Sequence, residues 1–179
     1  MTPTSYALLE AAVREAERHV AVSGWDQNPR LFALVANAAL LEHEPDAAKA
    51  FGISSEHGWT PVEQEELPEG PFDEVLASLG WPAEVDGVLA VMERVVLPPS
   101  VESTLPTSDD GDDAEIAARL ASVASTHPLR DEVRMAVGVL RDGTRCCVLR
   151  LRKHDDDTSL LVGPDLVAGL ADALHATFD

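Results

Sequence analysis

The sequence predicts an α+β domain in two layers, with helices covering a mainly antiparallel sheet of about four to five strands. Segments whose apolar residues follow helical spacing are interspersed with short runs rich in β-branched residues. Two of these runs flank an Asp142-Gly143 turn and are typical of a β-hairpin. The length of 179 residues matches one domain, so we expect a single domain over residues 1–179.

The first segment is predicted to be a helix because its apolar residues recur every three to four positions. We expect the helix to begin at Thr2-Pro3 or at Ser5, and Gly24 offers a left-handed C-terminal cap. The apolar stripe consists of Leu9, Val13, Ala16 and Val20.

Residues 30–36 form a short apolar run typical of a buried strand, and residues 37–51 return to a helical pattern that Pro45 interrupts. Residues 52–70 are polar, and we expect an exposed loop there. A short helix is predicted to begin within residues 70–74, where proline and acidic residues precede the apolar ones, and to end at Gly80. The expected loop carries several nearby carboxylates, namely Glu63, Glu65, Glu66 and Glu69.

Residues 87–97 fit either a helical face or a strand that is buried on both sides. The β-branched content is high, and Asp-Gly before the run and Pro-Pro after it are turn signals. These features favour a central strand.

Residues 98–113 are rich in Pro, Ser, Thr and acidic residues, which predicts a flexible acidic connection. Asp112 and Glu115 then have the spacing of a capping box, and an amphipathic helix is predicted from there to the stop at Pro128.

The hairpin that follows has two possible registers. A two-residue loop pairs Met135 with Arg150 and so places a charge on the apolar face, whereas a three-residue loop with a left-handed Gly143 pairs Met135 with Leu149. A shift of one residue moves every side chain to the other face, so the second register is predicted because it leaves one face wholly apolar. That face carries Met135, Val137, Cys147, Leu149 and Leu151, and the outer face carries Cys146, Arg134, Arg150 and Arg152.

The chain is expected to end with a turn at 154–157, a short edge strand at 159–162 and a helix that Pro164 and Asp165 open. The apolar stripe of this last helix is predicted to be Leu166, Leu170, Leu174 and Phe178.

The charge balance excludes several classes of partner. Thirteen basic residues against 32 acidic ones give a net charge of −19, which repels phosphate backbones and anionic lipid head groups. Aromatic residues, at 4%, are too few for base-stacking platforms. No apolar run approaches the ~18 residues of a membrane span, and the N-terminus lacks a signal-peptide pattern. We expect no nucleic-acid partner, no membrane partner and a cytoplasmic location.

Motifs with a defined chemistry are missing from the sequence. There is no Gly-rich phosphate loop, no G-x-S-x-G nucleophile elbow and no pair of histidines at H-x-x-x-H spacing. The only cysteines, Cys146 and Cys147, are adjacent, and neighbouring strand residues point to opposite faces, so a structural role is favoured over a redox role. We therefore predict no catalytic residues, no cofactor and no metal. The three tryptophans are expected to close the ends of the core.

One segment has the opposite charge to the rest of the chain. Seven of the 13 basic residues and only three acids lie within 130–153, a local charge of +4 against −23 for the remainder. Such a segment can attract an anionic group or an acidic partner. The alternative, which the abundance of acids favours, is neutralisation by acidic segments of the same chain such as 63–69 or 109–115. The candidate anion- or partner-binding patch consists of Arg134, Arg150 and Arg152.

Several blocks together carry a resemblance to a known family: GWDQNPRLFALV (24–35), TPVEQEELP (60–68), GWPAEVDGVLAVMERVVLPP (80–99), DEVRMAVGVLRDGTRCCVLRLR (131–152) and GPDLVAGLADAL (163–174). The chain resembles an uncharacterised actinobacterial family of small acidic soluble proteins with no assigned function. The resemblance spans nearly the whole chain, which supports a single domain, and it brings no catalytic residues. An excess of Arg over Lys, eleven to two, fits a high-GC genome. At the level of the fold, helices over an antiparallel sheet look like secretion-chaperone-type modules, which bind extended protein segments.

Two classes of function remain. The first is a non-catalytic binding or adaptor protein that engages a protein partner or a second copy of itself. The alternative is a small-molecule-binding protein or an enzyme whose site is assembled from distant residues. A shallow groove or an exposed apolar patch would favour the first class, and a deep closed pocket with convergent polar groups would favour the second.

Overall fold

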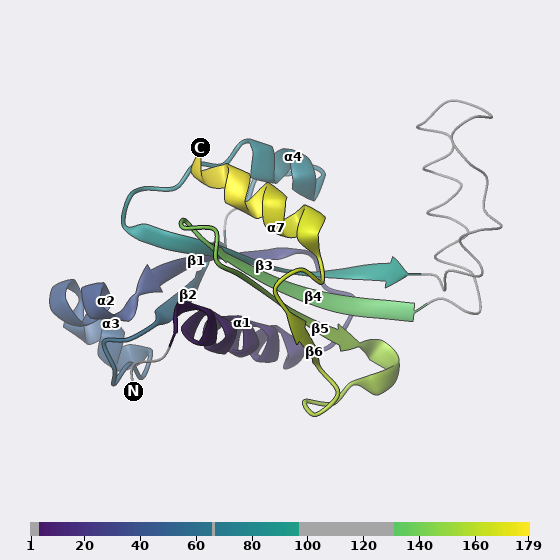
Figure 1. Cartoon of the computed structure of the whole chain (residues 1–179), viewed down its shortest axis with the longest axis horizontal. Helices are drawn as coiled ribbons and strands as arrows, with labels where there is room; N and C mark the ends of the chain where they lie inside the picture. Colours follow the sequence, from purple (N-terminus) through teal and green to yellow (C-terminus); the bar gives the residue numbers. More distant parts are fainter. Residues whose placement is uncertain (1–3, 66, 97–130) are drawn as a thin grey trace.

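The computed structural model describes residues 4–65, 67–96 and 131–179 (Figure 1). These residues form one antiparallel sheet with helices packed on it. The strands are β1 (Arg30–Ala36), β2 (Trp59–Glu63), β3 (Val85–Val96), β4 (Asp131–Leu140), β5 (Arg145–Leu151) and β6 (Leu161–Gly163). The α-helices are α1 (Ser5–Ala21), α2 (Asn37–His43), α3 (Pro45–Ala50), α4 (Phe72–Ala77) and α7 (Ala168–His175), and two 3₁₀ helices are η2 (Arg152–His154) and η3 (Ala176–Phe178).

The sheet is larger than the sequence predicted. Among the described residues it has six strands in the order β2-β1-β3-β4-β5-β6, and each neighbouring pair is antiparallel. The additional strand is β2, which lies within residues expected to form an exposed loop. The strands predicted at 30–36 and 87–97 are confirmed as β1 and β3.

Helices cover both faces of the sheet, so the protein has three layers and the two-layer prediction is wrong. Figure 1 shows α1 on one face and α4 with α7 on the other. Two separate groups of buried side chains correspond to these faces. Leu9, Val13, Phe32, Leu89 and Val148 belong to the group under α1, whereas Leu31, Leu76, Val88, Val137 and Leu174 belong to the group under α4 and α7.

Helix α1 has the predicted stripe, and Leu9, Val13, Ala16 and Val20 are all buried. Its N-cap is Thr4, whose side chain accepts a hydrogen bond from the backbone N–H of Ala7 at 3.2 Å. The helix therefore begins at Ser5, one of the two starts that the sequence suggested. The helix lies close to the sheet because Gly138 is beneath it, where a Cβ atom would lie 2.6 Å from Cγ2 of Val13.

The predicted hairpin register is confirmed, since β4 and β5 pair Val137 with Cys147 and Met135 with Leu149. Gly143 has a φ of +92°, as the three-residue loop requires. The exposure of the two faces differs from the prediction, because α1 covers the face expected to be outermost. Cys146 is therefore fully buried rather than on an outer surface, while Leu149 and Leu151 are only half-buried.

The predicted connection at 98–113 and the predicted helix between Asp112 and Pro128 lie outside the described residues. The last helix begins later than expected, at Ala168, and Leu166 of the predicted stripe is exposed. None of the helices that the structure describes combines the length and the apolar character required to cross a bilayer.

Candidate functional site

The sequence-predicted patch of arginines lies beneath and beside α1. Arg134 of β4 and Arg150 of β5 are direct cross-strand partners on the face that α1 covers. Their exposed fractions are 1% and 4%. Arg152 follows β5 in η2 and keeps 40% of its side chain exposed. The fold thus brings the three predicted residues together but buries two of them.

Glu17 of α1 is the buried partner of these arginines. Its carboxylate accepts hydrogen bonds from Nε and Nη2 of Arg150 at 2.6 and 2.9 Å, and its Oε1 atom lies 3.6 Å from Nη1 of Arg134. Hydrogen bonds with Glu17 raise the pKa of the Arg150 guanidinium above its ordinary value. A buried charge requires such a partner, so the pair anchors α1 on the sheet.

Trp25 organises the exposed side of this cluster. The guanidinium carbon of Arg134 lies 4.4 Å from the centre of the indole ring, and that of Arg152 lies 5.6 Å from it. The indole N–H donates to Asp155 at 3.0 Å. Arg134 also donates to the carbonyl oxygen of Gly24. The ring of Trp25 therefore makes cation–π contacts, and its N–H makes a hydrogen bond, with residues of this cluster.

The cluster is neutralised within the chain rather than open to an anion. The three arginines meet six carboxylates, those of Glu17, Glu93, Asp26, Glu132, Asp155 and Asp157. These carboxylates differ from the acidic segments that the sequence suggested, because Glu63 pairs with Arg30 instead and residues 109–115 lie outside the described residues. The acids that neutralise the arginines come from α1, the loop after it, β3, β4 and the turn after η2.

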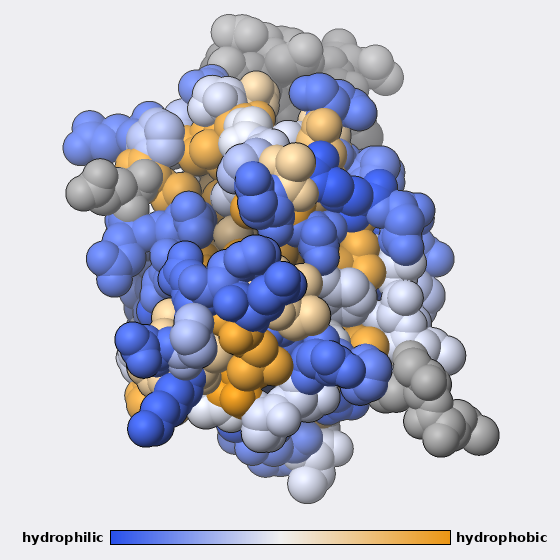
Figure 2. All heavy atoms as spheres, turned by 90° about the vertical axis from the view of Figure 1, so that its left-hand side faces the viewer, coloured by the Kyte–Doolittle hydropathy of each residue, from blue (hydrophilic) through white to orange (hydrophobic). Residues whose placement is uncertain are grey.

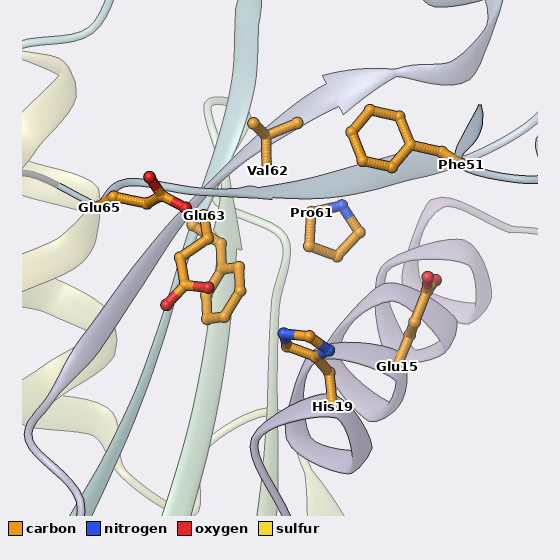
Figure 3. A pocket seen from close by; sticks show the side chains of 8 residues that line it. Glu15, His19, Phe51, Pro61, Val62, Glu63 and Glu65 are labelled. Atoms are coloured by element: carbon orange, nitrogen blue, oxygen red, sulfur yellow. The ribbon is translucent and has the colours of Figure 1, made fainter. Parts of the chain in front are cut away.

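A groove between α1 and the edge strand β2 has a different character. Its volume is about 410 Å³. Figure 3 shows Glu15 and His19 rising from α1 toward the strand, with Pro61 facing them and Phe51 at one end. The complete lining consists of Glu15, His19, Phe32, Phe51, Pro61, Val62, Glu63 and Glu65.

The groove combines apolar surface with excess negative charge. Phe32 is buried, and Phe51, at the end of α3, has 55% of its surface exposed. Glu63 binds Nε and Nη2 of Arg30 at 2.5 and 2.8 Å, and this bond lowers the pKa of the Glu63 carboxyl group. Glu15 and Glu65 are exposed and form no ion pair with any other described residue. In the part of the chain that the structure describes, these two carboxylates thus have no ion-pair partner.

The groove lining supplies carboxylates, one imidazole and apolar surface. Within residues 4–65, 67–96 and 131–179, no three His, Cys, Asp or Glu side chains are placed to hold a metal ion. Among the described residues, the lining includes no Ser, Thr, Cys or Lys as a nucleophile. An apolar floor bordered by carboxylates suits a ligand that joins an apolar part to a positive charge.

The backbone of β2 determines how a ligand reaches this edge. Gln64 donates to Leu31 at 2.8 Å, and Asn37 donates to Gly58 at 3.0 Å, so even-numbered residues of this segment face β1. The backbone groups of Trp59, Pro61 and Glu63 then point away from the sheet. Pro61 has no N–H to offer there, which weakens pairing with another strand. A ligand in the groove would therefore contact side chains rather than add a strand to the sheet.

A second hollow lies over the sheet between α4 and α7, with a volume of about 570 Å³. Most of its lining is apolar, including Phe72, Leu76, Met92 and Leu170, and Asp73 and Arg94 also line it. Figure 2 views the opposite end of the sheet, where α2 and α3 lie; there, hydrophobic patches are bordered by hydrophilic side chains.

The cysteines and the tryptophans are engaged in packing and hydrogen bonds, although Cys146 was expected on the outer face. Cys146 and Cys147 are both free and fully buried. Each indole N–H has a hydrogen-bond acceptor: Asp155 for Trp25, Asp86 for Trp59 and Thr177 for Trp81. These side chains are accounted for by packing and hydrogen bonding.

The groove itself was not predicted from the sequence. Its residues come from α1, β1, the end of α3 and β2, and β2 lies within the polar stretch 52–70 that predicted an exposed loop. One signal was available, namely the run Trp59-Thr60-Pro61-Val62, in which three of four residues favour strands. Proline at an edge position does not end a strand.

Comparison with known proteins gives one match. The family model described as PPA1309-like protein matches residues 9–179. No curated protein matches the chain, and no solved structure matches it.

Proposed function

We propose that this chain, which belongs to the family of PPA1309-like proteins, is a non-catalytic binding or adaptor protein that holds a segment of a partner protein in the groove between α1 and β2. The observation that carries the proposal is the pair of carboxylates that meet no described cation, Glu15 and Glu65, beside an exposed phenylalanine. Binding of an extended segment in this way has a parallel in secretion-chaperone-type α+β modules. Two free, buried cysteines are consistent with action in the cytoplasm.

The sign of the charge favours a basic segment. The chain carries a net charge of −19, and the hairpin cations Arg145, Arg150 and Lys153 are already paired with carboxylates. An acidic surface accelerates association with a cationic partner and repels an anionic one. Phe51 and Pro61 add apolar contact area, which charge alone does not supply.

The test is a binding titration with a fluorescent peptide that contains lysines and leucines in a Gly-Ser background. Glu15→Gln with Glu65→Gln is expected to weaken binding by about tenfold, and a peptide with glutamates in place of the lysines should not bind. The matched control is Glu42→Gln on α2, since Glu42 is equally exposed but does not line the groove. Equal affinity of wild type and the double variant would overturn the proposal.

The hollow between α4 and α7 favours a second candidate function, the binding of a small apolar molecule. Its volume and mainly apolar lining lie within the range of small-molecule sites. Met92→Trp would fill the hollow, so it should abolish the fluorescence gain of an apolar dye and leave binding of the lysine-leucine peptide unchanged. Dye fluorescence that persists in Met92→Trp would exclude this hollow as the site.

A further inference from the structure

We propose that the groove accepts a lysine or arginine side chain of the partner segment and that protonation of His19 displaces it. This inference rests on the proposed function, and it adds the chemical class of the occupant and the regulation of its binding. His19 is one helical turn from Glu15 and lines the same groove as Glu63 and Glu65. Figure 3 shows the imidazole pointing from α1 toward Pro61 and Glu63.

The carboxylates of the groove that have no described cationic partner define the chemical class of the occupant. Glu15 and Glu65 meet no described cation, whereas the Glu63 carboxylate is already bound to Arg30. Lysine and arginine have long apolar stems below a charged head, so the stem can lie along Phe51 and Pro61 while the head reaches one carboxylate; Figure 3 shows Glu15 and Glu65 at opposite ends of the groove. A purely apolar residue would leave both carboxylates unpaired, and an acidic one would be repelled.

His19 is the histidine that lines the groove. The charged groups that face it are Glu15 from α1, Glu63 of β2 with its partner Arg30 of β1, and Glu65 after β2, while α3 contributes the uncharged Phe51. Histidine gains its proton between about pH 8 and pH 5. An imidazolium at this position supplies the carboxylates with a cation from the protein itself and repels the cation of the ligand.

The experiment measures the affinity of the labelled lysine-leucine peptide at about pH 7.5 and about pH 5.5, a range above that in which carboxylates ordinarily titrate. For the wild-type chain we expect a loss of about threefold to tenfold in affinity on acidification. His19→Gln should bind with nearly equal affinity at both pH values. His19→Lys, which carries a permanent charge, should bind weakly at both.

A histidine outside the groove provides the control. His43→Gln on α2 changes an exposed histidine that does not line the groove, and it should retain the pH dependence of the wild type. If the wild-type chain fails to bind the peptide at about pH 7.5, the proposed function fails. If it binds but His19→Gln keeps the full pH dependence, the role of His19 is overturned and the proposed function stands.

Discussion

Arg150 of β5 and Glu17 of α1 are 133 residues apart in the chain and form a two-pronged ion pair inside the protein, with N–O distances of 2.6 and 2.9 Å. The pair joins the first helix to the penultimate strand. Arg134, the cross-strand partner of Arg150, lies beside the same carboxylate. One glutamate thus compensates two guanidinium groups at the interface between α1 and the sheet.

Glu17→Gln is expected to be strongly destabilising. The substitution preserves the shape of the side chain but removes the charge that compensates Arg134 and Arg150, and breaking a buried pair in this way costs about 3–5 kcal/mol. Urea unfolding followed by circular dichroism measures the change. Glu10→Gln, which removes a partly exposed pair with Arg14 in the same helix, should cost at most about 0.5 kcal/mol. Similar costs for the two variants would show that the buried pair does not anchor α1.

Gly138→Ala tests how closely α1 approaches the sheet. The new Cβ atom would lie 2.6 Å from Val13 and 3.1 Å from Leu9, so the helix must shift, at a cost of about 1–3 kcal/mol. Gly169→Ala in α7 is the control, since no described atom lies within 4 Å of the position that its methyl group would take, and alanine favours helices. Free energies of unfolding compare the two variants. A neutral Gly138→Ala would contradict the close packing of α1.

The two thiols should be unreactive in the folded protein. Burial raises the pKa of Cys146 to about 11 and also raises the pKa of Cys147, so few molecules carry the reactive thiolate at about pH 8. Labelling with Ellman's reagent should be slow in the native state and rapid in urea. Ser23→Cys adds an exposed thiol as an internal standard. Native thiols that react as fast as this standard would contradict the burial of both cysteines.

The pair between Arg30 and Glu63 should stabilise the protein in a defined pH range. The hydrogen bond from Arg30 lowers the pKa of Glu63 below its ordinary value of 4.5. The folded state therefore binds this proton less readily than the unfolded state does, so the stabilisation is present above the ordinary value and is lost as the pH falls through the lowered one. Glu63→Gln should cost about 1 kcal/mol at neutral pH. Urea unfolding at a series of pH values should show the difference from wild type shrinking as the pH falls below 4.5; a constant difference would contradict the prediction.

Local sequence patterns were sufficient to predict several secondary-structure elements. The run at 30–36 could be predicted as a strand because six consecutive apolar residues follow Arg30. The hairpin register followed from the same kind of argument, since the observed alignment pairs Met135 with Leu149 and keeps Arg150 off the face of Met135 and Val137. The buried apolar stripe of α1 could likewise be predicted from helical periodicity alone.

The candidate site required information that no local pattern contains. Pro61 is tolerated in β2 because its missing N–H points away from β1, a condition set by the position of β2 at the sheet edge. The groove then depends on α1 lying opposite that edge, which brings Glu15 and His19 to Pro61 and Glu63.

The sequence by itself determined which side chains share a face of each helix and strand, because backbone geometry fixes that periodicity. It did not determine whether a face with arginines meets water or a helix. Only the tertiary structure decided that α1 covers Arg134 and Arg150 and that Glu17 pairs with both of them. The physical reason is that a charge is compensated by whichever carboxylate the fold brings within a few ångströms, and here that carboxylate comes from the opposite end of the chain.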